Sequence, residues 1–417
     1  MTVFGTRPEA IKLAPVIQQL EARDDVFETV NVSSSQHTTL LHPFTDLFGL
    51  RIDFDLEVMQ QARTLSDLCA HVLRSLDSIL AQVQPDLTLV QGDTTTALAG
   101  ALAGFHRRVP VGHVEAGLRT GNELSPYPEE MNRRLITRLA SYHFAPTPGN
   151  RDNLLAEGVP SERIFLTGNP VVDSLQAIRD VVSSVPAVDR LLLSTEGLRR
   201  IVLTTHRRES FGEVMSENLR VVRRFVERHS DVAVIFPVHP NPAVRSAANA
   251  ILSGHPRICL IPPLRYEEFI ALLAHTWLII SDSGGVQEEA PTLGKPLLIL
   301  RENTEVPEAV TCGVARLVGG DPLRFASMLE EIHDDGLWMK QVQNTSNPFG
   351  EGDSGKRIVE AIEQVLGVSS VRVCRQDGHF VKCFLRAQPQ REQSIRQSQP
   401  ATARSWGGRS SAVAAGT

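Results

Sequence analysis

The chain has little of three things that mark particular classes of protein: cysteine, aromatic residues and long apolar runs. Its five cysteines are widely spaced and form no Cys-x-x-Cys pair. This argues against a disulfide framework or a structural zinc and favours a reduced, cytoplasmic protein. Aromatic residues make up 5% of the chain, which disfavours a carbohydrate-stacking module or a single-strand nucleic-acid binder. No apolar run approaches the roughly 18 residues of a membrane span, and the N-terminus shows no secretory signal, so we expect no membrane insertion.

An excess of positive charge is also missing from most of the chain. The formal net charge is −6, so no overall field attracts nucleic acid, and we expect no nucleic-acid partner. Residues 371–417 are the exception, because they hold eight basic side chains against two acidic ones. This segment therefore carries +6 and the remainder −12. Its Gln, Ser, Arg, Gly and Ala content predicts a disordered basic tail, and a solvated extension is favoured over a polyanion-binding element.

Short apolar runs alternate with amphipathic segments along the rest of the chain, which predicts an α/β fold with parallel sheets and covering helices. The length exceeds one ordinary core, and the alternation restarts near Ile201 after a connector at 170–198. We therefore expect two doubly wound, Rossmann-like domains with the ligand in the cleft between them. The expected divisions are 1–168 for the N-terminal domain, 175–355 for the C-terminal domain, 356–370 for a C-terminal helix and 371–417 for the tail.

The individual elements follow from the same alternation. We expect strands at residues 2–4, 29–33, 87–91, 111–114, 142–146, 164–167, 201–204, 232–237, 259–261, 278–281 and 297–300. We expect helices at residues 9–22, 64–83, 95–105, 129–140, 149–157, 213–229, 266–274, 285–293 and 355–366.

Acidic and basic side chains gather in residues 112–134, GHVEAGLRTGNELSPYPEEMNRR, directly after an expected strand. Its glycines and prolines rule out one continuous helix, so the segment forms a loop that folds back on itself. Carboxylates on such a loop, backed by cations, suit proton transfer next to an anionic substrate. A solvated, salt-bridged loop is the alternative. The charged residues in question are Glu115, Glu129, Glu130, Arg119, Arg133 and Arg134.

Two further strand ends in the N-terminal half carry polar residues. Thr6 and Glu9 have the spacing of a capping box, whereas Arg7 lies at a helix N-terminus that favours an anion, and Lys12 follows one turn later. Asp93 closes the strand at 87–91. Its spacing suits a helix N-cap, and a chemical role at the strand end is compatible with capping.

The C-terminal half offers two candidate phosphate sites. His206 lies beside two arginines after the strand at 201–204, a poor setting for a core histidine and a good one for contacting phosphate. Ser283, Gly284 and Gly285 open a helix after the strand at 278–281, where backbone N–H groups can hold a diphosphate. Glu288 or Glu289 can bind ribose hydroxyls, and the alternative is that both complement the helix dipole. Nothing has metal-ligand spacing, so we expect no metal and no cofactor.

Eight segments taken together resemble the non-hydrolysing UDP-N-acetylglucosamine 2-epimerases of bacterial type. They occur in the family's order between residue 2 and about residue 366: FGTRPEAIKLAP, VQGDTTT, VGHVEAGLRTG, SPYPEEMNRR, HRRES, SDSGGVQEEAP, RENTEVPEA and NPFGEGDSGKRI. The resemblance implies a two-domain fold of the glycosyltransferase-B type and a homodimer. It also implies interconversion of UDP-GlcNAc and UDP-ManNAc, which supplies ManNAc for cell-surface polysaccharide.

The resemblance also implies a mechanism without a cofactor, in which UDP is eliminated to leave 2-acetamidoglucal and is then added back. By motif, Asp93, Glu115 and Glu129 are the acid/base groups, with individual roles left open, and His206 assists the departing UDP. Lys12 adds positive charge in the cleft and Glu289 binds the ribose. The diphosphate would be held by Arg7, Ser283, Gly284 and Gly285.

Two segments depart from the family pattern. Thr-Gly-Gln-His in the family is Ser34-Ser35-Gln36-His37 here, so Gln36 and His37 remain as candidates for a second, activating UDP-GlcNAc site. Val306 stands where the family has Arg, which removes a cation from the cleft edge. Three other functions stay open: a hydrolysing relative, a glycosyltransferase of the same architecture, and a UDP-sugar-binding protein that has lost catalysis.

Overall fold

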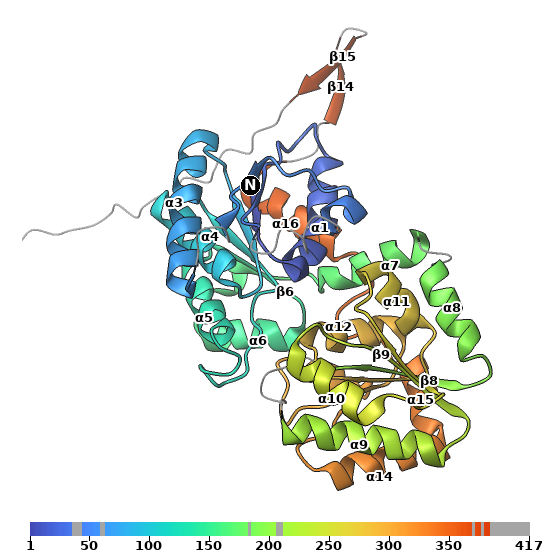
Figure 1. The fold of residues 1–417 in the computed structure, drawn as a ribbon. Coiled ribbons are helices and arrows are strands. Elements are labelled where there is room, and N and C mark those ends of the chain that lie inside the picture. Colours follow the sequence, from blue (N-terminus) through green and yellow to red (C-terminus); the bar gives the residue numbers. More distant parts are fainter. Residues whose placement is uncertain are drawn as a thin grey trace, which may run out of the picture. The chain divides into compact units, whose positions relative to one another are not determined.

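A seven-stranded parallel sheet forms the first half of the framework in this computed structural model (Figure 1). The structure describes residues 1–35, 44–58, 63–181, 185–205, 212–368, 372–376 and 379–383. The strands of the first sheet are β1 (Thr2–Phe4), β2 (Asn31–Ser33), β3 (Phe54–Asp55), β4 (Thr88–Gln91), β5 (Val111–Val114), β6 (Tyr142–Ala145) and β7 (Ile164–Leu166). Their spatial order is β3-β2-β1-β4-β5-β6-β7, so the direction of winding reverses between β1 and β4.

A six-stranded parallel sheet repeats this plan in the second half. Its strands are β8 (Arg199–Thr204), β9 (Val232–Pro237), β10 (Ile258–Ile261), β11 (Leu278–Ser281), β12 (Leu297–Ile299) and β13 (Ala315–Leu317). The order β10-β9-β8-β11-β12-β13 reverses between β8 and β11. Ligands of doubly wound sheets bind at the carboxyl ends of the strands beside such reversals. The predicted fold class, two doubly wound parallel sheets, is therefore confirmed.

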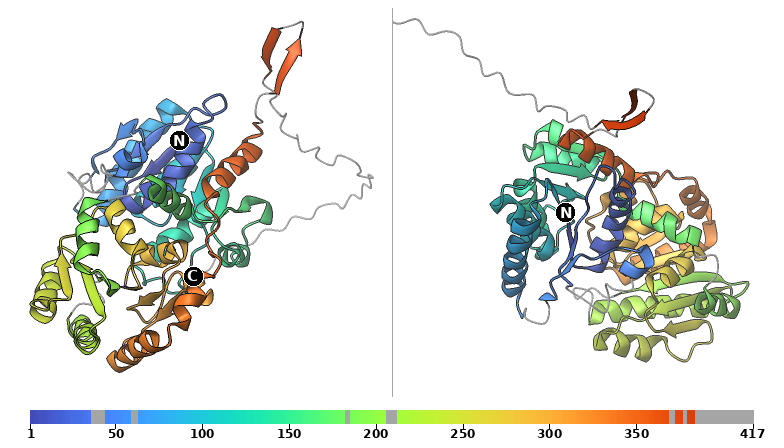
Figure 2. Two further views of the ribbon diagram at one scale, coloured as in Figure 1. Left: turned by 90° about the vertical axis from the view of Figure 1, so that its right-hand side faces the viewer. Right: turned by 90° about the horizontal axis from the view of Figure 1, so that it is seen from above.

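Helices cover both faces of each sheet (Figure 2). Around the first sheet these are α1 (Arg7–Glu21), α3 (Leu65–Val83), α4 (Thr95–His106), α5 (Glu129–Leu139) and α6 (Pro148–Ala156), with a short 3₁₀ turn at Ser161–Arg163. Two helices, α7 (Pro170–Val181) and α8 (Pro186–Ser194), lie between the sheets in the chain. Those of the second half are α9 (Glu213–Arg228), α10 (Pro242–Leu252), α11 (Tyr266–Ala274), α12 (Gly284–Leu293), α13 (Pro307–Thr311), α14 (Pro322–Asp335), α15 (Leu337–Gln343) and α16 (Ser354–Leu366).

The last of these helices, α16, returns to the beginning of the chain and contacts α1 and α7. The Asp173 carboxylate of α7 accepts hydrogen bonds from the backbone N–H groups of Ser354 and Gly355, at 3.2 and 2.9 Å. An anion at a helix N-terminus satisfies N–H groups that have no partner within the helix. Met1–Leu366 thereby form one unit that holds both sheets. The expected domain division at 168–175 stays a prediction.

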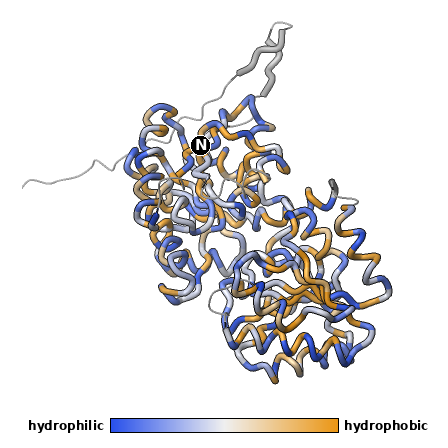
Figure 3. Tube along the Cα trace, in the orientation of Figure 1, coloured by the Kyte–Doolittle hydropathy of each residue, from blue (hydrophilic) through white to orange (hydrophobic). Residues whose placement is uncertain are grey.

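The core divides according to the two faces of the first sheet. Val3 and Phe4 are neighbours in β1 but belong to two different buried clusters, because successive side chains of a strand point to opposite faces. The cluster of Phe4 continues into the second sheet, whose strands are almost wholly apolar (Figure 3). Strands buried on both faces read as continuous hydrophobic runs, and β9, Val-Ala-Val-Ile-Phe-Pro, is of this kind.

Most of the expected elements are found within a few residues, but several were not expected. The short strands β3 and β13 were missed, as were α10, α13, α14 and α15. Helix α8 occupies part of the segment that we expected to be a connector. At α10 the local signal was present, because Asn241 accepts a hydrogen bond from the N–H of Ala243 and Pro242 begins the helix. An N-cap followed by proline is a common start of a helix.

In the C-terminal segment, Gly367–Thr417, the structure describes two short strands. They are β14 (Arg372–Gln376) and β15 (His379–Cys383), and they pair antiparallel. The structure describes these ten residues as a hairpin, and the prediction of a disordered tail at 371–417 stays a prediction. Asp-Gly separates the two strands in the sequence, and this dipeptide between strand-like segments is the usual sequence signal of a hairpin.

Within the described part of the chain, no helix combines the length and the apolar character that crossing a bilayer requires.

The loop after β5 depends on one glycine. Gly117 has a φ of +95°, and a Cβ there would lie 2.2 Å from the backbone oxygen of Asn150 in α6. Gly121 in the same loop has a φ of +78°, yet no described atom lies within 4 Å of its Cβ position. Both glycines adopt a backbone conformation that other residues disfavour. They differ only in the space around them.

We predict that Gly117→Ala lowers the free energy of unfolding by about 3 kcal/mol or more, because it adds a backbone clash to backbone strain. Gly121→Ala, the matched control, should cost only about 1 kcal/mol for the strain alone. Urea unfolding followed by circular dichroism measures both. Equal losses would show that the close approach of Gly117 to α6 does not exist in solution.

Candidate active site

The loops after β1, β4 and β5 meet at the carboxyl edge of the first sheet. Glu9 of α1 ties two of them together. One of its carboxylate oxygens accepts from the backbone N–H groups of Gly5 and Thr6, at 3.0 and 2.7 Å, and the other accepts from the Thr94 hydroxyl at 2.7 Å. The predicted capping box of Thr6 and Glu9 is confirmed. Glu9 also fixes the β1 loop against the β4 loop, which the sequence did not indicate.

Lys12 lies at the centre of this edge, between two buried carboxylates. Its ammonium nitrogen contacts Oε1 of Glu115 and lies 2.7 Å from Oε2 of Glu288. Asn169, just before α7, donates one amide nitrogen to both carboxylates, at 3.0 Å to Glu115 and 3.1 Å to Glu288. Gln91, at the end of β4, also donates to Glu115. The site thus joins the end of the first sheet to α12 of the second.

The two carboxylates differ in protonation. Burial favours the neutral form of each. At Glu115 the charge of Lys12 and the hydrogen bonds outweigh burial, so the pKa of Glu115 lies below its ordinary value. At Glu288 burial and the neighbouring charge of Glu115 outweigh Lys12, so the pKa of Glu288 lies well above its ordinary value. Burial opposes the charge of Lys12 too, but the two carboxylates together raise its pKa. The two shifts favour the negative charge on Glu115 and the proton on Glu288, beside the ammonium group of Lys12.

Asp93 lies beside this group but does not cap the following helix. Thr94 is the N-cap of α4, and its hydroxyl accepts from the N–H of Ala97 at 3.0 Å, so the N-cap interpretation of Asp93 is wrong. The Asp93 carboxylate instead forms an ion pair with Arg133 of α5. Its carbonyl oxygen accepts from the Asn132 amide at 2.8 Å. These contacts hold Asp93 at the strand end and leave about a quarter of its side chain exposed.

The two glutamates that begin α5 have different surroundings. Glu130 is fully buried and lies 3.3 Å from Arg133 and 3.1 Å from Arg134, so this residue is salt-bridged, as the alternative for the loop expected, but it is not solvated. Glu129 is the first residue of α5 and is only half-buried.

The second sheet contributes the turn from β11 into α12. Ser283 is the N-cap residue of α12, and Gly284 and Gly285 form its first turn. Glu289 is buried and accepts a hydrogen bond from the Tyr266 hydroxyl at 3.0 Å. Burial raises the pKa of Glu289, although Tyr266 and the nearby Arg7 oppose the rise.

Aromatic rings lie near Glu289 and come from both halves of the chain. The ring of Tyr266 lies 5.5 Å from that of Phe44, and the Arg7 guanidinium lies 5.5 Å from the Phe44 ring centre. Arg7, the first residue of α1, is exposed. Its charge therefore lies at the opening of the site, near the carboxylate that we expect to bind ribose.

The outcome for the predicted site residues is mixed. Lys12 and Glu115 are in contact, Asp93 and Glu129 lie on the neighbouring β4 loop and α5, and Ser283, Gly284, Gly285 and Glu289 lie on the α12 turn. His206, Gln36 and His37 lie outside the described residues, and their roles stay predictions. Asn169, Tyr266 and the contact of Glu288 with Lys12 were missed. Asn169 lies three residues after the end of β7, on a strand-end loop like those of Asp93 and Glu115, and this could have signalled it.

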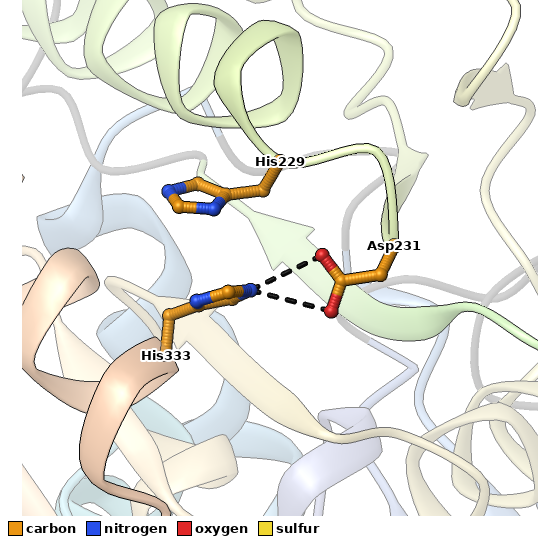
Figure 4. Close-up of side chains that lie close together, drawn as sticks. All are labelled: His229, Asp231 and His333. Atoms are coloured by element: carbon orange, nitrogen blue, oxygen red, sulfur yellow. Dashed lines mark hydrogen bonds and ion pairs between the residues drawn. The ribbon is translucent and has the colours of Figure 1, made fainter.

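A separate group of metal-ligating side chains lies at the opposite edge of the second sheet. It consists of His229, Asp231 and His333 (Figure 4). The His333 ring bonds both Asp231 oxygens, at 3.1 and 3.3 Å, and His229 bonds Glu330 at 2.7 Å. The two imidazole centres are 4.0 Å apart. The rings pack at an interplanar angle of 37° and each contacts a carboxylate, and we assign no metal to them.

The fold and the site define a doubly wound α/β protein with buried carboxyl groups and a lysine at the strand ends. Comparison with known proteins identifies the family. The model of a family described as UDP-N-acetylglucosamine 2-epimerase matches residues 18–363. The protein of that name from Escherichia coli O157:H7 is 45% identical over 368 residues, which cover 87% of this chain and 98% of the relative. Its namesake from Bacillus subtilis is 44% identical over 363 residues, covering 87% and 94%. The chain belongs to the UDP-N-acetylglucosamine 2-epimerase family.

Solved structures agree with this assignment. The UDP-GlcNAc 2-epimerase from Neisseria meningitidis, bound to UDP-GlcNAc, matches with a TM-score of 0.82 at 38% identity, covering 87% of this chain and 99% of that one. The enzyme from Methanocaldococcus jannaschii, in complex with UDP-GlcNAc and UDP, matches with a TM-score of 0.74 at 33% identity, with the same coverage. The expected glycosyltransferase-B-type architecture is confirmed.

Two buried histidines lie in the strands β5 and β6, next to the site. His113 of β5 pairs in register with His143 of β6, and burial lowers their pKa values to about 3 and about 4. His113 donates its Nε2–H to the carbonyl oxygen of Gly92 at 2.7 Å, and burial lowers its pKa enough to keep the ring neutral at pH 7. In the unfolded chain each ring binds a proton near its ordinary pKa of about 6.5. Between about pH 6.5 and 4 the unfolded state therefore binds more protons, and stability falls as pH falls.

We predict that His113→Gln flattens this dependence. As the pH falls from 6 to 4, the native chain should lose about 1.4 kcal/mol more unfolding free energy per pH unit than the variant does. Urea unfolding at several pH values measures the slope, which is independent of any constant cost of the substitution. His106→Gln, at an exposed histidine, serves as the control and should keep the native slope. An unchanged slope in His113→Gln would mean that His113 is protonated in the folded chain.

Proposed function

We propose that this protein interconverts UDP-GlcNAc and UDP-ManNAc at C2 by eliminating UDP and adding it back through 2-acetamidoglucal. The observation that carries the proposal is the buried, ionised Glu115, which is paired with Lys12 at the carboxyl edge of the first sheet and faces the α12 turn. Relatives with this fold bind UDP-GlcNAc, which supports the same substrate here.

Elimination explains why such a site needs both carboxylates and positive charge. The C2 proton of the sugar is not next to a carbonyl, so removing it alone would leave a carbanion without stabilisation. If the C1–O bond breaks as the base takes the proton, the electron pair forms the C1–C2 double bond and UDP carries away the negative charge. Protonation of C2 from the other face, with return of UDP to C1, gives the epimer. Each direction requires a base, an acid and stabilisation of the diphosphate.

The described residues suit these tasks. Glu115 is ionised and can accept a proton, while Asp93 and Glu129 lie on neighbouring elements as the further acid/base groups. Their division of labour between the two faces of C2 is open. The α12 N–H groups at Gly284 and Gly285 and the Arg7 guanidinium offer positive potential to the diphosphate. His206 would assist the departing UDP. Glu289, in exchange for its bond to Tyr266, would accept from the ribose hydroxyls.

Several finer expectations belong to the same proposal. We propose that the enzyme acts in the cytoplasm as a homodimer, divides into domains at 1–168 and 175–355, and supplies ManNAc for cell-surface polysaccharide. Gln36 and His37 would belong to a second, activating UDP-GlcNAc site. The family resemblance supports all of these except the activating site, because the segment of Gln36 and His37 departs from the family pattern.

Two substitutions test the assignment of the carboxylates. We predict that Glu115→Gln and Glu129→Gln each lower kcat for epimerisation by about 10²-fold or more, because a positioned acid/base group contributes that much. UDP binding, measured by calorimetry, should change little. Anion-exchange chromatography of the products separates UDP-GlcNAc, UDP-ManNAc and UDP. Glu123→Gln, an exposed position in the same loop, is the matched control and should keep the native rate.

The same chromatogram distinguishes the alternatives. UDP accumulating in step with sugar consumed would point to a hydrolysing enzyme or a transferase. Bound UDP-GlcNAc without any product would point to a binding protein. Native rates in both Glu115→Gln and Glu129→Gln would contradict the assignment of the acid/base groups.

A further inference from the structure

Glu288 is a buried carboxyl group for which the proposed chemistry has no task. It lies on α12 next to Glu289, but the two side chains have different partners: Glu289 bonds Tyr266, and Glu288 contacts Lys12 and Asn169. All of these groups are buried or nearly so. Glu288 is therefore the point at which the second sheet contacts the Lys12–Glu115 pair of the first.

Charge balance determines the state in which Glu288 can occupy this position. Lys12 supplies one positive charge to two carboxylates, and the Asn169 amide adds donors but no charge. Two anions at such short range in a site removed from water cannot both be ionised, so one must carry a proton. Glu115 has the additional donor Gln91, which favours the anion on Glu115. The proton therefore resides on Glu288, and the carboxyl groups of Glu288 and Glu115 are hydrogen-bonded to each other.

We propose that Glu288 is a positioning residue for the epimerisation, which holds Lys12 and Glu115 in their reactive arrangement from the second sheet; this inference rests on the proposed function. As a neutral acid it donates to Glu115, and its oxygens accept from Lys12 and Asn169. It leaves the negative charge on Glu115 and keeps the ammonium group between the two carboxyl groups. It does not itself exchange protons with the substrate.

This role can be separated from others because an amide can replace a neutral acid. Glu288→Gln keeps the size, the donor to Glu115 and the acceptor for Lys12, loses only the acceptor that faces Asn169, and has no proton to exchange. Glu288→Ala removes all three contacts. Glu288→Leu fills the space without hydrogen bonds and serves if the alanine variant does not fold. Glu360→Gln, at an exposed position of α16, is the control.

We predict that Glu288→Gln keeps kcat within about threefold of the native value, whereas Glu288→Ala and Glu288→Leu lower kcat at least about 30-fold. KM and the Kd for UDP should change less than about threefold in all of them, because Glu288 contacts neither phosphate nor ribose in the proposed binding arrangement. Infrared spectra at pH 7 should show the C=O band of a protonated carboxyl group in the native enzyme. This band should be absent from Glu288→Gln and present in Glu360→Gln.

Every outcome bears on the proposal. A glutamine variant as inactive as the alanine variant would make Glu288 a proton-exchanging group and overturn the positioning role. Native kcat in Glu288→Ala and Glu288→Leu would show that the contact is dispensable. A parallel rise in KM with the fall in kcat would indicate a general structural effect. If the native enzyme fails to epimerise UDP-GlcNAc, both the proposed function and this inference are wrong. If the native enzyme is active and the Glu288 variants do not behave as predicted, only the role of Glu288 is wrong.

Discussion

One ammonium group holds the candidate site together, because Lys12 is the positive charge that two buried carboxyl groups share. Taking a carboxylate out of water costs several kcal/mol unless a cation and good hydrogen bonds replace the water. At Glu115 the replacement comes from Lys12, Gln91 and Asn169 together. The ionised state of Glu115, on which the proposed proton transfer depends, is therefore a consequence of where α1 places Lys12.

The doubly wound topology explains how these groups meet. Helix α1 begins directly after β1, beside the reversal of strand order, so Lys12 stands over the carboxyl ends of β4 and β5. Helix α12 follows β11 at the equivalent reversal of the second sheet. Two sheets of the same plan thus contribute in different ways. The first supplies carboxylates and a lysine, and the second supplies a helix N-terminus for an anion and, one turn later, the carboxyl group of Glu288.

Local sequence signals predicted the parts of this arrangement that depend on local structure. Asp93 and Glu115 could be placed at strand ends because the signal is local. An apolar run and the polar, glycine-containing turn that follows it lie within about ten residues. The partners of Lys12 could not be predicted in this way. Glu115 and Glu288 lie far from Lys12 in the sequence and contact it only when both sheets are assembled. The choice between Glu288 and Glu289 as a ligand-facing group depends on the rotation of α12, which its neighbours fix. Asp93 was misassigned as an N-cap because the hydroxyl of Thr94 serves that helix and Arg133 attracts the Asp93 carboxylate.

The central claim is that a buried carboxylate moves the C2 proton during reversible elimination of UDP. Proton NMR of the enzyme with UDP-GlcNAc in deuterated water tests it most directly. The account predicts UDP-ManNAc and recovered UDP-GlcNAc that carry deuterium at C2, without accumulation of free UDP. Epimerisation that retains the original C2 proton, or release of UDP and ManNAc in equal amounts, would contradict it.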